Sequence, residues 1–153
     1  ENLLVDKDFF NKLSSLNIAW GFVSGTEHAS AKFVLEKKLG LNKPPLIAMG
    51  DAPEKPDPRG FLSLIKKIFN TDLKNIKEPI GYVGDTVADV LTVINARSLQ
   101  SNLNLISFAI SPPHLHSVFN KDSKIIYEKI LKEKGADIIL EKTNDLIKYV
   151  QEW

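Results

Sequence analysis

The sequence predicts an α/β fold built on a doubly wound, Rossmann-like parallel sheet, with helices in layers on both of its faces. Five short apolar runs alternate along the chain with longer segments of helical period. Within each run the apolar residues are continuous rather than alternating, which is typical of parallel strands covered on both faces. Strand alternating with helix implies right-handed crossovers, which place the helices on the two faces of the sheet.

The elements follow one another in a regular order. We expect strands over residues 18–23 (IAWGFV), 46–49 (LIAM), 80–83 (IGYV), 105–110 (LISFAI) and 136–140 (ADIIL). Apolar residues at helical spacing predict helices over residues 29–39, 61–69, 87–94 and 126–134, and a short one over 144–151. A further helix over residues 7–16 is expected to begin at Asp6, a favourable N-cap, and Gly135 is a natural glycine at the end of the helix over 126–134.

Composition and charge exclude several classes of protein. The 153 residues carry 20 Lys+Arg against 19 Asp+Glu, a formal net charge of +1, which gives no electrostatic footprint for nucleic acid or an anionic membrane. The absence of cysteine excludes disulfides, thiolate zinc sites and a cysteine nucleophile. No apolar run approaches the roughly 20 residues of a membrane span, and no charged-then-apolar leader opens the chain. We therefore expect one cytoplasmic α/β domain without nucleic-acid or membrane partners.

Chemistry is expected where the strands end, because open parallel sheets bind ligands at the carboxyl ends of their strands. The first strand leads into Ser24 and Gly25. The backbone N–H groups of this turn and the Ser24 hydroxyl can hold a phosphate oxygen. The alternative interpretation of the same residues is a turn and a helix cap without a ligand.

The second strand leads into the segment GDAPEKPDP at residues 50–58. Its lysine, Lys55, lies among prolines that stiffen the backbone, so its ammonium can be held in place to neutralise a carboxylate or a phosphate. A solvated loop lysine is the alternative. Asp51 and Asp57 are best interpreted as turn or cap residues.

The third strand leads into GDTVAD at residues 84–89, where Asp85 ends the strand and Asp89 follows one helical turn later. This spacing lets both carboxylates approach one point above the edge of the sheet. Hard oxygen ligands presented in this way suit Mg²⁺, which takes one or two protein carboxylates together with water and substrate phosphate. As the alternative, both residues also favour the N-terminus of a helix through capping and the helix dipole.

In order and spacing, these residues resemble the later motifs of the haloacid dehalogenase-like (HAD) hydrolase superfamily, most of all its capped, phosphoglycolate-phosphatase-like branch. Ser24 resembles the motif II hydroxyl residue, Lys55 the motif III lysine, and Asp85 with Asp89 the motif IV acidic pair. The resemblance extends over nearly the whole chain. It implies a Mg²⁺-dependent phosphate-monoester hydrolase that acts on a small phosphorylated metabolite through an aspartyl-phosphate. Ser24 and Lys55 would be catalytic, Ser24, Gly25 and Lys55 would bind phosphate, and Asp85 and Asp89 would bind the metal.

The family's nucleophile is the first aspartate of a DxD motif at the end of the first strand. Asp6 and Asp8 have this spacing and follow the short apolar run 3–5. However, only 18 residues separate Asp6 from Ser24, and the predicted helix over 7–16 uses about half of them. Too few residues remain for the turn and flap that follow motif I in this family, or for a cap. We therefore expect motif I, its strand and the cap domain to lie upstream of Glu1, with residues 1–153 forming the rest of the core.

This expectation has a structural consequence. In the family's sheet the first strand is central, between the strands that end in Ser24 and Asp85. A chain without it has a gap in its sheet, with apolar surface and unpaired backbone groups, unless residues 2–5 or another polypeptide fill it.

Other functions stay open at this point. One is a noncatalytic HAD-like domain that keeps Ser24, Lys55 and Asp85 for phosphate or partner binding, and another is carbon–halogen substitution on the same core. A receiver or flavodoxin-like domain is a third alternative, but the combination of KPDP and GDTVAD fits it badly, and the sequence has no P-loop or GxGxxG.

Overall fold

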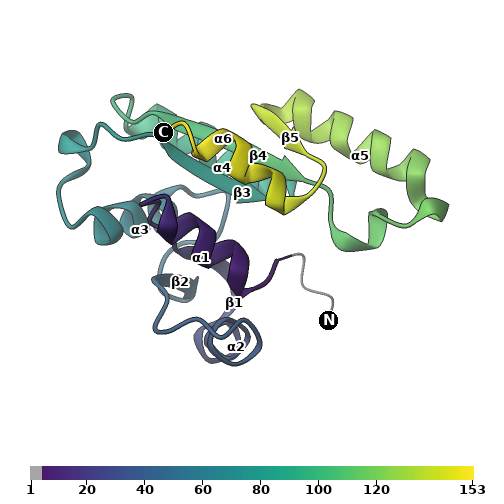
Figure 1. Cartoon of the computed structure of the whole chain (residues 1–153). Helices are drawn as coiled ribbons and strands as arrows, with labels where there is room; N and C mark the ends of the chain where they lie inside the picture. The colour runs from purple at the N-terminus through teal and green to yellow at the C-terminus, as the bar shows by residue number, and fades with distance from the viewer. Residues whose placement is uncertain (1–4) are drawn as a thin grey trace.

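Five parallel strands form two separate sheets, one of two strands and one of three (Figure 1). The structure is a computed structural model, and it describes residues 5–153. The first sheet pairs β1 (Phe22–Glu27) with β2 (Leu46–Met49), and the second has the order β3 (Ile80–Gly84), β4 (Leu105–Ile110), β5 (Ile138–Leu140). The predicted α/β class and the parallel pairing of the strands are confirmed.

Helices precede, separate and follow the strands. They are α1 (Lys7–Ser15), α2 (His28–Phe33), α3 (Arg59–Phe69), α4 (Val87–Leu99), α5 (Lys121–Lys134) and α6 (Leu146–Val150). The predicted caps are present: the backbone N–H of Phe9 donates to Asp6 Oδ1 at 3.2 Å, and Gly135 ends α5 with a φ of +120°. Between residues 5 and 153, no helix combines the length and the apolar character that a bilayer crossing requires.

Several boundaries differ from the prediction: β1 also ends later, at Glu27, α4 extends to Leu99, and α5 begins earlier, at Lys121. β1 begins at Phe22 rather than at residue 18, because its ladder starts where the Phe22 N–H donates to the Pro45 carbonyl, just before β2. β5 begins at Ile138 rather than at residue 136, because the Ala136 N–H still donates to the Leu131 carbonyl in the cap of α5. The helix predicted over 29–39 is divided into α2 and a π-helical turn, Val34–Lys38.

Helices cover both faces of the sheets, and the buried residues form separate clusters accordingly. On one face α1, α2 and α6 pack on inward residues of β2 and β4; the cluster includes Phe10, Leu13, Leu46, Phe108 and Leu146. On the other face α3 and α4 pack on β3 and β4; that cluster includes Phe61, Ile65, Ile80, Tyr82 and Val93. A third cluster joins α4 and α5 around Val90, Ala109 and Leu131. The predicted layering of helices on two faces is therefore present.

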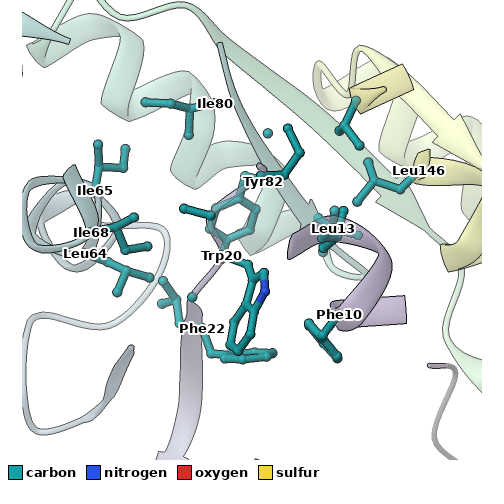
Figure 2. A pocket seen from close by; sticks show the side chains of 18 of the residues that line it. Phe10, Leu13, Trp20, Phe22, Leu64, Ile65, Ile68, Ile80, Tyr82 and Leu146 are labelled. Atoms are coloured by element: carbon teal, nitrogen blue, oxygen red, sulfur yellow. The ribbon is translucent and has the colours of Figure 1, made fainter. Parts of the chain in front are cut away.

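The two sheets are separated by a cavity of about 810 Å³ between β1 and β3 (Figure 2). Among the described residues β1 pairs only with β2, and β3 pairs only with β4. Apolar side chains of α1, α3 and the segments at β1 and β3 line this space, among them Phe10, Leu13, Trp20, Phe22, Leu64, Ile68 and Tyr82. We call it the gap; it lies between the two strands where the sequence predicted that one strand is missing.

The alternative that residues 3–5 form the missing strand is not supported at its one described position. Residues 1–4 lie outside the described part of the chain, and Val5 lines the gap without belonging to a strand. Asp6 and Asp8 lie at the beginning of α1, as its N-cap and in its first turn, and not at the end of a strand. Helix capping therefore accounts for Asp6.

Since the gap leaves apolar side chains and strand edges in contact with water, we expect the isolated 153-residue chain to be only marginally stable. Its free energy of unfolding should lie at or below about 5 kcal/mol, the lower end of the range for natural domains. Urea-induced unfolding followed by far-UV circular dichroism and by tryptophan fluorescence measures it. A single cooperative transition with a free energy well above that value would contradict the interpretation of the gap as a missing part of the fold.

Candidate functional site

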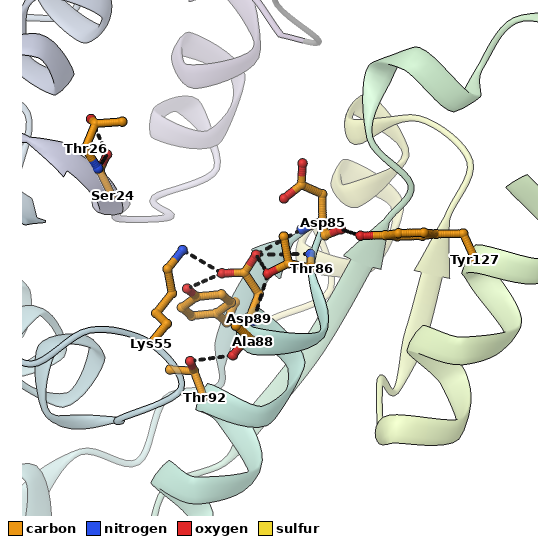
Figure 3. Close-up of polar contacts among 10 residues, drawn as sticks. Ser24, Thr26, Lys55, Asp85, Thr86, Ala88, Asp89, Thr92 and Tyr127 are labelled. Carbon is orange, nitrogen blue, oxygen red and sulfur yellow. Dashed lines mark hydrogen bonds and ion pairs between the residues drawn. The ribbon is translucent and has the colours of Figure 1, made fainter.

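The carboxyl ends of the strands carry a polar cluster centred on the buried carboxylate of Asp89, in the first turn of α4 (Figure 3). Its Oδ1 accepts hydrogen bonds from Lys55 Nζ at 2.7 Å and from the Tyr82 hydroxyl at 2.8 Å. Its Oδ2 accepts from the backbone N–H groups of Asp85 and Thr86, both at 3.2 Å, and from the Thr86 hydroxyl at 2.8 Å. Asp89 thus accepts five hydrogen bonds, three from the loop between β3 and α4, one from β3 and one from Lys55.

These contacts hold Asp89 in its ionised form. Burial by itself would raise the pKa of Asp89, but the hydrogen bond and the positive charge of Lys55, with the bonds from Thr86 and Tyr82, lower it below its ordinary value. The pKa of the Tyr82 hydroxyl is shifted in the opposite direction: burial and the adjacent charge of Asp89 raise it. Tyr82 is therefore a neutral donor to a carboxylate at physiological pH.

Asp85 has a different environment from Asp89. Its carboxylate points away from the cluster and carries no bond to the other labelled side chains in Figure 3. Burial, and then the repulsion by Asp89, raise the pKa of Asp85 above its ordinary value. On the far side of the loop the Tyr127 hydroxyl of α5 donates to the Asp85 backbone carbonyl, which ties the loop to α5. Asp85 is thus a half-buried carboxylate on a fixed backbone that a cation would stabilise.

Lys55 reaches this cluster from the loop between β2 and α3. Its side chain is mostly buried, with 24% exposed, and its ion pair with Asp89 joins residues 34 positions apart. The same loop is bonded to α4 a second time, since Asn95 Nδ2 donates to the Pro56 carbonyl at 3.0 Å. Lys55 is therefore held by a carboxylate of the protein rather than solvated, and its contact with phosphate stays a prediction.

Ser24 lies within β1, where the register between β1 and β2 is irregular between Val23 and Glu27. Its Oγ accepts from the Thr26 backbone N–H at 3.1 Å and lies 2.8 Å from the Thr26 hydroxyl oxygen. Gly25 has open space around it, since a Cβ placed there would meet no atom within 4 Å. In residues 5–153 no hydrogen bond joins Ser24 to Lys55, Asp85 or Asp89, and Figure 3 shows Ser24 and Thr26 apart from the other labelled residues.

The other aspartates at this edge have local roles, as predicted. Asp51 accepts from the Ala48 backbone N–H at 2.9 Å and pairs with His28 Nδ1 at 3.3 Å, while its own N–H closes a turn. Asp57 accepts from the backbone N–H of Arg59 and pairs with the Arg59 guanidinium at the start of α3. Both are turn residues, and Asp57 also bonds the first residue of α3.

The two carboxylates fit a magnesium site unequally. No group of three or more His, Asp or Glu side chains in residues 5–153 forms a ready metal-binding cluster. Mg²⁺ needs only one or two protein carboxylates, because water and substrate supply its other ligands. Asp85 has the free oxygen atoms for this role, whereas Asp89 would have to give up a hydrogen bond to act as a ligand. Direct coordination by Asp89 stays a prediction.

Two residues of the cluster were not predicted from the sequence: Tyr82 and Thr86. Tyr82 is the one polar side chain in the otherwise aliphatic strand 80–83, and the hydroxyl of a buried tyrosine requires a hydrogen-bond partner. Thr86 is the N-cap of α4 and forms a capping box with Asp89. The spacing Thr-x-x-Asp after a strand is a signal that could have predicted this box.

Comparisons with known proteins assign no family to the chain. No protein-family description matches it, and no curated protein matches it either.

Proposed function

We propose that the protein is a Mg²⁺-dependent phosphate-monoester hydrolase of the HAD type, which acts through an aspartyl-phosphate. One observation carries the proposal: the ammonium of Lys55 is held 2.7 Å from the carboxylate of Asp89, beside a second carboxylate, Asp85, at the carboxyl end of β3. A fixed cation next to an acidic pair is suited to the negative charge of a transferring phosphoryl group and its metal.

Lys55 has hydrogen-bonding capacity left for a substrate. An ammonium has three N–H donors, and the ion pair with Asp89 uses one of them. The other two can donate to phosphoryl oxygens, while Asp89 keeps the side chain oriented and offsets its charge when no substrate is present. Ser24 and Gly25 would bind a further phosphate oxygen, through the Ser24 hydroxyl and backbone N–H groups of this irregular part of β1.

Asp85 would hold the metal together with water and a phosphate oxygen, and Asp89 would keep the Asp85 backbone in place. The bound metal supplies charge neutralisation at the phosphoryl group. The nucleophilic aspartate would come from a polypeptide segment outside residues 5–153, since Asp6 is engaged as the N-cap of α1. Ser24 of β1 and Asp85 at the end of β3 belong to different sheets on opposite sides of the gap, so such a segment would complete the site between them.

Hydrolysis of an aryl phosphate by the complete protein tests the proposal. We expect turnover that requires Mg²⁺ and is abolished by EDTA. Asp85→Asn should reduce kcat/KM by at least about 100-fold, and Lys55→Ala by about 10- to 100-fold, because each change removes an electrostatic contact to the reacting group. Full activity of either variant would disprove the site assignment.

A matched control separates this proposal from its alternatives. Asp8→Asn changes an exposed aspartate of α1 and should leave turnover unchanged, whereas its inactivation would favour Asp6 and Asp8 as the DxD pair. Phosphate binding without turnover would favour a noncatalytic phosphate-binding domain. Halide release from a 2-haloacid, with no phosphate release, would favour carbon–halogen substitution.

A further inference from the structure

The gap presents two unpaired strand edges to one another. The Phe22 N–H donates to the Pro45 carbonyl of the segment entering β2, and the Ile80 N–H donates to the Asn104 carbonyl of the segment entering β4. Successive residues of a strand direct their backbone groups to alternate sides, so the next residues face the other way. The backbone N–H and C=O groups of Gly21 and Val23 on one side, and of Gly81 and Val83 on the other, are therefore directed toward the gap.

The two edges run in the same direction. β1 and β2 are parallel, and β3 and β4 are parallel. The loop that follows β2 brings Lys55 to Asp89, just after β3, so β2 and β3 end toward the same edge and β1 runs in the same direction as β2. A strand placed between them can pair with both edges at once only if it is parallel to both. Parallel pairing on two sides satisfies the backbone groups that are otherwise left to water.

The faces of the gap define the side chains of its occupant. Phe10 and Leu13 of α1 line one face, and Leu64, Ile65 and Ile68 of α3 line the other (Figure 2). Strand side chains alternate between the two faces of a sheet, so a segment between these helices needs apolar residues at successive positions.

Charge distinguishes the two ends of the gap. The charged residues that line it are Lys55, Glu78, Asp85 and Asp89. Lys55 neutralises Asp89, and Glu78 is left at the end where β3 begins. A basic residue just before the inserted strand would complement Glu78.

We propose that the gap binds one extended polypeptide segment from outside residues 5–153, which inserts as a strand parallel to β1 and β3 and joins the two sheets into one. The segment has about five consecutive apolar residues and is preceded by basic ones. This inference rests on the backbone edges and the apolar lining, and it holds whether or not the protein hydrolyses phosphate esters. An apolar small molecule would fill the same space but would leave both rows of backbone donors unpaired.

A synthetic peptide added to the 153-residue chain tests the proposal. The probe is an acetylated and amidated peptide of two lysines, five alternating valines and isoleucines, and two glycines. We expect the backbone amides of Val23 and Val83 to exchange with solvent at least about tenfold more slowly when the peptide is bound, because new hydrogen bonds protect them. The amides of Phe22 and Ile80, which already donate within their sheets, should change less.

Tryptophan fluorescence gives a second readout, since Trp20 and Trp153 both line the gap and are the only two tryptophans of the chain. Binding should change their emission and raise the midpoint of thermal unfolding with peptide concentration. A peptide with proline at two of the apolar positions cannot donate at those positions and should lose the effect. A peptide with glutamates in place of the lysines should bind more weakly, owing to repulsion by Glu78.

Several results would overturn the proposal. The proline-containing peptide could bind equally well, or no peptide could bind at all. Protection could be confined to the outer edges of β2 or β5, or the tryptophan emission and the stability could change without protection of Val23 and Val83. Protection of the same two amides that appears without peptide and grows with protein concentration would show that a second copy of the chain is the occupant, and would equally overturn it. These assays do not measure turnover, so their failure and the failure of the proposed phosphatase activity are distinguishable.

Discussion

The variant Gly84→Ala should lose about 3 to 5 kcal/mol of stability, which is enough to leave a marginally stable chain largely unfolded. A Cβ at residue 84 would lie 2.3 Å from the Cβ and 2.4 Å from the Cγ of Asp89. Asp89 cannot move aside without losing the hydrogen bonds that it accepts from Lys55, Tyr82 and Thr86. The added methyl group therefore displaces the centre of the polar cluster as well as overpacking the turn.

Gly25→Ala is the matched control, because a Cβ at residue 25 meets nothing within 4 Å. Thermal and urea-induced unfolding of the two variants, beside the unchanged chain, measure the difference. We expect Gly25→Ala to unfold close to the unchanged chain. If Gly84→Ala unfolded at the same midpoint as Gly25→Ala, the close packing of Asp89 against the β3–α4 turn would be wrong.

Removing the charge from the two aspartates of the acidic pair should change stability in opposite directions. Because the pKa of Asp85 is raised on folding, its carboxylate is less stable in the folded chain than in the unfolded one at neutral pH. Asp85→Asn should therefore stabilise the chain at pH 7, by up to about 1 kcal/mol after allowance for solvent screening of a half-buried group.

Because the pKa of Asp89 is lowered on folding, its carboxylate stabilises the folded chain. Asp89→Asn removes that contribution and leaves the mostly buried ammonium of Lys55 without its counter-charge. We expect a loss of about 2 to 3 kcal/mol at pH 7, below the usual cost for a fully buried pair because Lys55 retains some contact with solvent.

The pH dependence separates the two effects. The loss caused by Asp89→Asn should be present above the unfolded pKa of aspartate, about 3.9, and should disappear as the pH falls through the lower pKa of folded Asp89. The gain from Asp85→Asn should disappear earlier on acidification, between the raised pKa of folded Asp85 and about pH 3.9.

Urea-induced unfolding at a series of pH values from 7 to 3 measures the stability change of each variant. Asp122→Asn, in the first turn of α5, is the exposed control. Equal effects of Asp85→Asn and Asp89→Asn would contradict the assigned environments.

The elements of the fold were predictable where apolar runs end at a clear break. Residues 46–49 and 105–110 form strands with the predicted bounds, because prolines or polar residues flank the runs. The start of β1 was not predictable, since it depends on where β2 becomes available for pairing. The π-helical turn was not predictable either. Its defining bond runs from the Leu39 N–H to the Val34 carbonyl, five residues back. Over so few residues, the spacing of apolar side chains is compatible with both an α-helix and a π-helical turn.

The candidate site was predictable as a set of residues but not as a set of bonds. The rule that ligands bind at the carboxyl ends of strands selected Ser24, Lys55 and Asp85. That Asp89 would accept five hydrogen bonds, one from Lys55, depends on the packing of a loop against a helix 34 positions away along the chain. Local sequence does not encode such a contact. The sequence does not distinguish Tyr82 from an ordinary core residue, because it stands in an apolar strand and is itself buried.

The loop over residues 50–58 contacts α4 at two points, Lys55 with Asp89 and Pro56 with Asn95. Since no ladder of strand-to-strand hydrogen bonds crosses the gap in residues 5–153, these two polar bonds and the side-chain packing of α1, α3 and α4 connect the halves. We therefore expect local opening at this boundary, in which β1, β2 and α2 move relative to β3, β4 and β5. The spacing of Ser24 from Asp85 would follow the extent of that opening.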